Sequence, residues 1–321
     1  MSRVDIMGAG VAGLAVAAAL AEAGHDVRVF DIAEAQGPAQ CSWWAGGMLA
    51  PHCERVTAEE AVVELGSEAA DWWERRTGSV VRNGTLVVAP GRDRAELSRF
   101  ARRTAAYEEI GAEAIAALEP DLAGRFDRAL HFPTEAHLDP RRALAALAEG
   151  LRARGVGIRH GETPPGDGAL TVDCRGFAAS GDLPDLRGVK GEMLVVRSAD
   201  IALSRPVRLV HPRHPLYVVP RGEGIFMLGA TMIESADRRR ITARSMMELL
   251  GAAHSLHPAF AEAEVLEIGV DVRPAFPDNL PRAEWRDGRL VVNGFYRHGF
   301  LLAPAMARRA AALVAAEERV A

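Results

Sequence analysis

Three glycines near the N-terminus have the spacing of a phosphate-binding turn. Gly8, Gly10 and Gly13 fit the pattern G-x-G-x-x-G, with Val11 and Ala12 inside it. The first glycine permits a tight turn, the second lets the backbone approach a pyrophosphate, and the third allows close helix–strand packing. The N-terminus of a following helix would add unpaired N–H groups and partial positive charge. The pattern predicts a dinucleotide site; the alternative is a strand–helix turn that binds no ligand.

A carboxylate follows this motif at the spacing expected for ribose recognition. Asp31 lies eighteen residues beyond Gly13, where an acidic side chain accepts hydrogen bonds from ribose hydroxyls. Because a carboxylate repels a 2′-phosphate, we expect FAD or NAD rather than NADP. The motif by itself leaves the choice between FAD and NAD open.

An arginine further along the chain could hold a substrate carboxylate. Arg273 ends an apolar run and stands directly before Pro274. A guanidinium can bind a carboxylate through two parallel hydrogen bonds, so Arg273 is the best candidate for this role. An arginine at a strand end is also common in surface ion pairs, and the residue alone does not decide between the two.

The elements that would position these residues begin with a strand, a helix and a second strand. Residues 4–7 form a short apolar run, residues 11–24 are rich in Ala and Leu, and residues 27–30 lead into Asp31. The helix would be the crossover between two parallel strands. We further expect helices over 57–76, 93–118, 141–154, 242–254 and 303–317, a hairpin over 80–89, and strands over 129–133, 170–172, 193–196, 207–210, 217–220, 225–229, 266–272 and 289–292.

The segment after the second strand indicates the cofactor. Residues 41–51, Cys-Ser-Trp-Trp-Ala-Gly-Gly-Met-Leu-Ala-Pro, resemble the flavin-contacting loop of the D-amino-acid-oxidase-like FAD-dependent oxidoreductase family, and look most like its glycine oxidases of thiamine biosynthesis. Four further stretches agree in order and spacing, so that the resemblance extends from the N-terminus to the final helix: 189–192, 217–221 with 228–232, 272–274 with 277–279, and 293–304.

This resemblance implies a fold, a cofactor and a reaction. The fold class is α/β: a Rossmann-like FAD-binding domain (1–78, 138–188 and 266–321) with an interleaved, mainly antiparallel α+β substrate domain (79–137 and 189–265). The cofactor would be FAD, the substrate glycine or another small amino acid, and the electron acceptor O₂. The products would be an imine or 2-oxo acid, ammonia and hydrogen peroxide, and the imine would supply the thiazole of thiamine.

The resemblance also assigns roles to individual residues. Arg273 and Tyr217 would bind the substrate carboxylate, Arg297 would lie beside flavin and substrate, and Met48 would lie near the ring. Backbone N–H groups at 299–302 would face the pyrimidine edge of the flavin, next to the N-terminus of the last helix. The residues expected to contact FAD are Gly8, Gly10, Val11, Ala12, Gly13, Asp31, Ser42, Ala45, Gly46, Gly47, Met48, Arg297, His298, Gly299, Phe300, Leu301 and Leu302.

The composition is that of an ordinary soluble protein. Of 321 residues 49% are hydrophobic and 25% charged, and the net charge is −5 with Lys and Arg scattered, which argues against a nucleic-acid partner. Three cysteines favour reduced thiols in the cytoplasm, and neither a signal peptide nor a membrane span is expected. His211 and His214 flank Pro212 without a third ligand at a sensible spacing, so no metal is predicted. The chain is compatible with a homo-oligomer.

Two features depart from the family pattern, and rival functions stay open. Residues 173–176, Asp-Cys-Arg-Gly, stand where a small apolar turn is usual, and residues 161–168 look like a trimmed strand pair. Both departures bear on the identity of the substrate and of the electron acceptor more than on the fold. The alternatives are a sarcosine- or D-amino-acid-type oxidase, a flavin dehydrogenase with another acceptor such as a quinone, an NAD enzyme, and a flavin-binding protein without catalysis.

Overall fold

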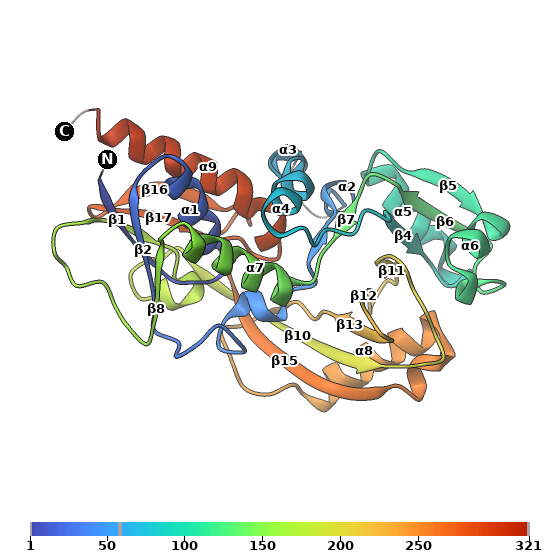
Figure 1. Cartoon of the computed structure of the whole chain (residues 1–321). Helices are drawn as coiled ribbons and strands as arrows, with labels where there is room; N and C mark the ends of the chain where they lie inside the picture. Colours follow the sequence, from blue (N-terminus) through green and yellow to red (C-terminus); the bar gives the residue numbers. More distant parts are fainter. Residues whose placement is uncertain (1, 57–59, 320–321) are drawn as a thin grey trace.

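Two large β-sheets organise the chain. The computed structural model describes residues 2–56 and 60–319, and Figure 1 shows the two sheets side by side, with both chain ends at the smaller one. That sheet has six strands, parallel except for one edge strand, in the order β16 (Arg282–Arg286), β17 (Arg289–Asn293), β9 (Leu170–Asp173), β1 (Arg3–Met7), β2 (Asp26–Asp31) and β8 (Gly157–His160).

Helices cover the six-stranded sheet because their apolar side chains must be buried against it. The helix α1 (Val11–Glu22) is apolar on nearly all sides and packs between β1, β2 and α9 (Gly299–Glu317). Its neighbour α7 (Pro140–Ala153) begins with Asp139 as its N-cap, whose carboxylate accepts the N–H of Arg141 at 2.8 Å. The short helices α3 (Glu60–Gly66) and α4 (Ala69–Thr77) lie against α9.

The larger sheet has nine strands, most of them antiparallel. Long β10 (Arg187–Arg197) pairs with β15 (Glu264–Ala275) on one side and with β13 on the other. The order from β10 onward is β13 (Ile225–Gly229), β12 (Leu216–Gly222), β11 (Val207–Leu209), β4 (Thr85–Val88), β6 (Arg128–Phe132) and β5 (Glu108–Gly111), and β14 (Ile233–Glu234) also pairs with β10. A second core lies between this sheet and α6 (Ala112–Leu118) and α8 (Ala243–Leu256), and α5 (Arg94–Arg103) packs beside β6.

The interleaving of the two units agrees with the expected fold class, with one boundary corrected. Residues 266–275 were expected in the FAD-binding unit, but they belong to β15 and pair with β10 in the nine-stranded sheet. The chain crosses to the six-stranded sheet only after Ala275, at β16 and β17. A small sheet of β3 (Met48–Leu49) and β7 (Ala136–His137) joins the two units.

Three local predictions differ from the structure. The expected hairpin over 80–89 does not form, because β4 pairs with β6 and β11, which are distant in sequence, and Val81 bridges to His137. The expected helix over 93–118 is broken into α5, β5 and α6, since residues 108–111 join the edge of the sheet beside β6. The expected helix over 57–76 is divided into α3 and α4, and its residues 57–59 lie outside the described residues.

The last helix begins at Gly299, four residues before the expected start. Pro304 has no N–H to donate to the Phe300 carbonyl, and the indole N–H of Trp73 donates to that carbonyl instead, at 2.8 Å. Among the described residues α9 is the single helix long and apolar enough to cross a membrane, and 56% of its apolar window is buried. Because α9 packs against α1, α3 and α4, its apolar character is accounted for by the core.

Candidate active site

One cavity connects the two large sheets. It has a volume of about 990 Å³ and runs from the carboxyl ends of β1 and β2 to β12 and β15, near the upper end of the range of about 300–1,000 Å³ common for ligand pockets. The predicted site residues in its lining are Gly8, Gly10, Val11, Ala12, Asp31, Ser42, Ala45, Gly46, Gly47, Met48, Tyr217, Arg273, Arg297, His298, Gly299, Phe300 and Leu301.

The glycine motif has the local structure that its spacing predicts. Gly8 has a φ of 101°, and a Cβ there would lie 2.6 Å from the Cys174 carbonyl oxygen. Gly13 lies outside the cavity lining, and a Cβ there would overlap the Gly8 carbonyl oxygen. Gly13 therefore serves close helix–strand packing, which leaves the start of α1 open toward the cavity.

Two side chains from the following segment hold this loop in place. The Asp31 carboxylate accepts hydrogen bonds from the backbone N–H of Ala9 at 2.7 Å and of Ala33 at 2.8 Å, and from the Gln40 amide at 2.9 Å. The Ser42 hydroxyl accepts the N–H of Val11, the first residue of α1, at 3.0 Å. The expected contact between Asp31 and a ribose stays a prediction.

The small-residue loop is held by a partly buried arginine. Arg221 of β12 donates to the carbonyl oxygens of Ala45 and Gly46, both at 3.0 Å, and to Leu138 at 2.7 Å. Burial lowers the pKa of Arg221 to about 10. Gly47 has a φ of 74°, and a Cβ there would overlap the Leu138 carbonyl oxygen. The loop is thus held in one conformation along the cavity wall.

The beginning of α9 closes the same end of the cavity. Gly299, Phe300 and Leu301 occupy its first turn, where backbone N–H groups have no acceptor within the helix. The N–H of Leu302 donates to the His298 carbonyl at 2.8 Å, and its side chain is buried. The expected contact between Leu302 and FAD stays a prediction. As the fourth helical residue, Leu302 is the first to join the hydrogen-bond ladder of the helix.

One face of the nine-stranded sheet forms the opposite wall of the cavity. Opposite residues in neighbouring strands point to the same face, and one row of them runs over β11, β12, β13, β10 and β15 as Arg208, Tyr217, Gly229, Met193 and Gly269. A Cβ at Gly229 would lie 2.7 Å from the Tyr217 ring. The missing side chain at 229 therefore lets the tyrosine ring lie flat beside β13.

Arg273 reaches the cavity from β15, next to this row. Its guanidinium donates to the Thr231 carbonyl at 3.0 Å and lies over Gly191, where a Cβ would overlap it. Burial raises the pKa of Tyr217, and the charge of Arg273 opposes that rise. Tyr217 is thus a neutral hydroxyl donor close to a cationic guanidinium, which is the pairing expected for a carboxylate site.

A second polar group in the cavity centres on Glu54, at the end of α2 (Pro51–Glu54). Its carboxylate pairs with Arg208, lies 2.7 Å from Arg297 Nη2 and 3.5 Å from His298 Nδ1. Met48 lies beside it, with its sulfur 3.6 Å from Arg208 Nη2. Arg297, His298 and Met48 were predicted to line the site, whereas Glu54 and Arg208 were not.

Burial and neighbouring charges set the protonation of this group. Burial alone would raise the pKa of Glu54, but Arg297 and Arg208 outweigh it and hold that pKa well below the usual carboxyl range. Burial lowers the pKa of His298 to about 4, against the opposing charge of Glu54. At neutral pH Glu54 is therefore ionised and His298 uncharged, so neither can readily take a proton from an ammonium group.

Comparison with known proteins decides the family. A family model described as FAD dependent oxidoreductase matches residues 3–313. The chain belongs to this FAD-dependent oxidoreductase family. A putative thiamine biosynthesis oxidoreductase ThiO of Rhizobium etli is 58% identical over 319 residues, which cover 98% of this chain and 97% of that relative. A glycine oxidase of Pseudomonas aeruginosa is 29% identical, with 99% and 96% covered.

Solved structures agree with the fold. The glycine oxidase of Bacillus cereus superposes with a TM-score of 0.81 at 22% identity, over 99% of this chain and 96% of the other. The glycine oxidase of Geobacillus kaustophilus gives 0.78 at 25% identity, over 99% and 95%. Membership in the FAD-dependent oxidoreductase family confirms the predicted enzyme class and selects FAD over NAD.

The cavity of this flavoenzyme fits FAD. The open start of α1 beside Gly8 and Gly10 suits a pyrophosphate. The fixed loop at residues 45–47 and the first turn of α9 border the part of the cavity next to Tyr217 and Arg273, where a flat ring would meet a small substrate.

The departure at residues 173–176 is a closed charge network. The buried Asp173 carboxylate accepts hydrogen bonds from Arg175 at 2.6 and 2.9 Å, and Arg175 also pairs with Asp182 at 2.5 Å. Asp173 further lies 3.6 Å from Arg289. The Arg175 charge is thus balanced by Asp173 and Asp182, although Arg175 borders the cavity.

Three residues of the site were missed or given too little weight. Arg208 alternates with the apolar Val207 and Leu209, and a charged residue on an otherwise buried strand is a signal that could have found it. Glu54 follows the small-residue loop directly. Met232 ends the family stretch 228–232, for which no role was predicted; its sulfur lies 3.3 Å from Arg297 Nη1 and 3.5 Å from the Tyr296 hydroxyl.

Proposed function

We propose that this flavoenzyme oxidises glycine or another small amino acid. Glycine would lose a hydride from Cα and a proton from its nitrogen to give the imine dehydroglycine, which water would hydrolyse to glyoxylate and ammonia. FAD, when bound, would accept the two electrons and pass them to O₂, giving hydrogen peroxide. The imine would supply the thiazole of thiamine, a role supported by the name of the Rhizobium etli relative.

The observation that carries this proposal is that Arg273 and Tyr217 line the same cavity. A guanidinium and a neutral hydroxyl can together bind one carboxylate, and Gly229 and Gly191 leave room for both side chains. The loop at residues 45–47 and the start of α9 border the same space. A substrate carboxylate bound to Arg273 would place its Cα toward the position of the flavin ring.

The residues of the site account for orientation and for the protonation state of the substrate. Glu54 and His298 both have lowered pKa values and are weak bases at neutral pH. The substrate would therefore react as its neutral amine, after giving its proton to water. The contribution of the protein is then orientation by Arg273 and Tyr217 and the exclusion of water.

The decisive experiment is anaerobic reduction of the purified protein. Glycine, sarcosine and D-alanine are mixed in turn with the yellow protein, and the visible flavin absorbance is followed. We expect glycine to bleach it, and readmitted air to restore the colour with one hydrogen peroxide per turnover. Bleaching by sarcosine or D-alanine alone would assign a different amine. Reoxidation by a quinone but not by O₂ would make the protein a dehydrogenase, and no bleaching by any amine would refute the proposal.

A further inference from the structure

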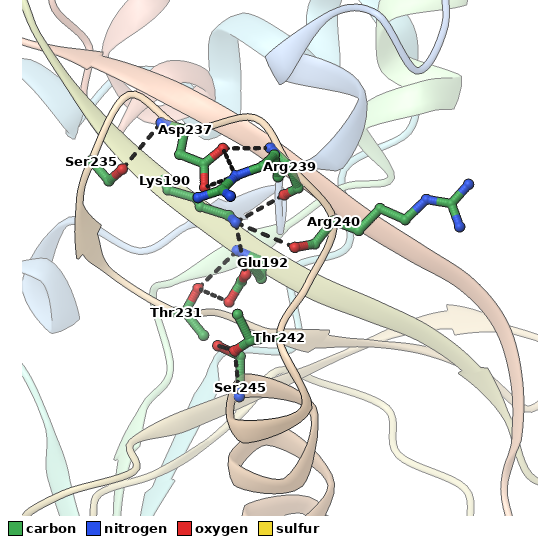
Figure 2. Close-up of polar contacts among 9 residues, drawn as sticks. All are labelled: Lys190, Glu192, Thr231, Ser235, Asp237, Arg239, Arg240, Thr242 and Ser245. Carbon is green, nitrogen blue, oxygen red and sulfur yellow. Dashed lines mark hydrogen bonds and ion pairs between the residues drawn. The ribbon is translucent and has the colours of Figure 1, made fainter.

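A buried ion pair lies next to the cavity, on the strand that faces Arg273. Lys190 and Glu192 of β10 are 4% and 0% exposed, and Lys190 Nζ lies 3.2 Å from Glu192 Oε1. Figure 2 shows both side chains in one cluster with residues of the segment after β13. A buried ion pair is seldom more stable than apolar residues of the same volume. The ion pair between Lys190 and Glu192 is therefore expected to serve a purpose other than stability.

Glu192 is bonded to Thr231 by both its backbone and its side chain. The Thr231 hydroxyl accepts the N–H of Glu192 at 2.9 Å and donates to Glu192 Oε2 at 3.1 Å, and the Thr231 N–H donates to the Glu192 carbonyl at 3.1 Å. Figure 2 shows the two bonds of the Thr231 hydroxyl, and together with the backbone bond they fix the Thr231 peptide. The carbonyl of that same residue accepts the hydrogen bond from Arg273 Nη1 at 3.0 Å.

Lys190 holds the segment that follows Thr231. Its ammonium group donates to the carbonyl oxygens of Arg239 at 2.8 Å and Arg240 at 3.5 Å. We call residues 232–241, which connect Thr231 to α8, the strap. Met232 and Arg238 of the strap line the cavity, and Arg238 lies 3.3 Å from Asp271 of β15. Lys190 thus ties the strap to the strand that carries its partner Glu192.

Gly191, between the two charged residues, completes the arrangement. It pairs with Asp271 in the register of β10 and β15, while Val189 pairs with Arg273. A Cβ at 191 would overlap the Arg273 guanidinium. Three consecutive residues of β10 therefore determine where the Arg273 guanidinium lies. Gly191 leaves space for it, and Glu192 fixes Thr231, whose carbonyl accepts its hydrogen bond. Lys190 neutralises the Glu192 charge and anchors the strap.

We propose that Glu192 and Lys190 are positioning residues that act through Thr231 on the Arg273 guanidinium. The inference rests on the proposed function in one respect, namely that Arg273 binds the substrate carboxylate. A hydrogen bond between Arg273 and the Thr231 carbonyl orients the guanidinium fork while leaving its other N–H groups for the ligand. The ion pair then determines how tightly a carboxylate binds, with little influence on the rate of the bound complex.

The test uses two substitutions of Thr231, one that removes the hydroxyl and one that keeps it. Thr231→Val removes the two bonds that the hydroxyl makes to Glu192 and keeps the side-chain volume and the backbone bond, and Thr231→Ser keeps the hydroxyl. We expect Thr231→Val to raise KM for the reducing amine about tenfold with kcat changed less than about twofold, and Thr231→Ser to stay close to wild type. Arg240→Gln, which retains the carbonyl that Lys190 contacts, is the control and should leave KM unchanged.

A second measurement does not depend on turnover. Glycolate carries the carboxylate of glycine without its amine, and its binding to the holoprotein can be followed by the visible spectrum of the flavin. We expect its Kd to rise as much as KM in Thr231→Val. If no amine reduces the flavin, the proposed function fails while the glycolate titration still tests the positioning. Wild-type protein that does not bind glycolate would overturn both the carboxylate site and the positioning.

A double-mutant cycle separates positioning from a general structural effect. If Thr231 acts through Arg273, Thr231→Val should add nothing to the glycolate Kd in an Arg273→Ala background. Lys190→Met with Glu192→Gln removes both charges at nearly constant volume, so no lone buried charge remains, and should also raise KM. Additive effects of Thr231→Val and Arg273→Ala, or an unchanged KM in the Lys190–Glu192 double variant, would overturn the inference.

Discussion

Glu54 Oε2 lies 2.7 Å from Arg297 Nη2, and this carboxylate joins two arginines that come from different parts of the chain. Arg208 contacts its other oxygen, and all three side chains border the cavity. Because Glu54 and Arg208 are largely buried, Arg208 depends on the Glu54 carboxylate for its charge partner.

Loss of the Glu54 charge is therefore expected to destabilise the protein. Glu54→Gln should lower the free energy of unfolding by about 3 kcal/mol, since Arg208 would remain as a buried cation without its carboxylate. Adding Arg208→Met to this variant removes the cation and should recover part of the loss. Urea unfolding of the holoprotein at constant FAD concentration measures both. If the double variant were as unstable as the sum of the two single variants, the proposed dependence would be wrong.

Replacement of Arg273 tests the carboxylate site directly. Arg273→Ala should raise KM for glycine about a hundredfold, because the charge partner of the carboxylate is lost. Arg273→Lys keeps the charge without the two-pronged geometry and should fall between that variant and wild type. Steady-state kinetics over a wide glycine range measure the change. Unchanged glycine kinetics in Arg273→Ala would exclude this residue from substrate binding.

A single methyl group at position 191 should displace the same guanidinium. The Cβ of Gly191→Ala would overlap Arg273, so the side chain must move and glycolate affinity should fall about tenfold or more. Gly181→Ala is the matched control, because nothing lies within 4 Å of a Cβ there. Spectral titration of both holoproteins with glycolate gives the comparison. Equal glycolate affinities in the two variants would show that the Arg273 guanidinium can occupy another position without weakening carboxylate binding.

Buried histidines predict a loss of stability in mild acid. Burial lowers the pKa of both His298 and His137 to about 4, against an ordinary value of about 6.5. Between these values the unfolded chain binds more protons than the native protein does. Each histidine therefore leaves stability unaffected above about pH 6.5 and lowers it by up to about 3 kcal/mol as the pH falls toward 4.

The variant His137→Gln isolates one of these contributions. Its free energy of unfolding should fall less between pH 7 and pH 4.5 than that of the wild type, as measured by urea unfolding. His254→Gln, at an exposed position of α8, should follow the wild-type curve. Parallel curves for His137→Gln and wild type would show that protonation of His137 does not contribute to acid unfolding.

Features set by neighbouring residues could be predicted from the sequence. The glycine spacing, the Ala- and Leu-rich helix and the strand before Asp31 determine the dinucleotide turn within some thirty residues, so backbone geometry and propensity suffice. The same holds for the start of α7, where Asp139 and Pro140 form a local cap. The family stretches predicted Tyr217, Arg273 and Arg297 as site residues, because residue types and their order along the chain can be read directly from the sequence.

Features that depend on pairing between distant segments were decided by the tertiary structure alone. β4 found partners in β6 and β11 instead of forming a hairpin, and residues 108–111 became an edge strand inside an expected helix. Glu54 meets Arg208 across 154 positions, and Lys190 meets the carbonyls of the strap across about fifty. Such contacts follow from strand register and burial, which depend on the packing of the whole chain, so no local pattern of residues could specify them.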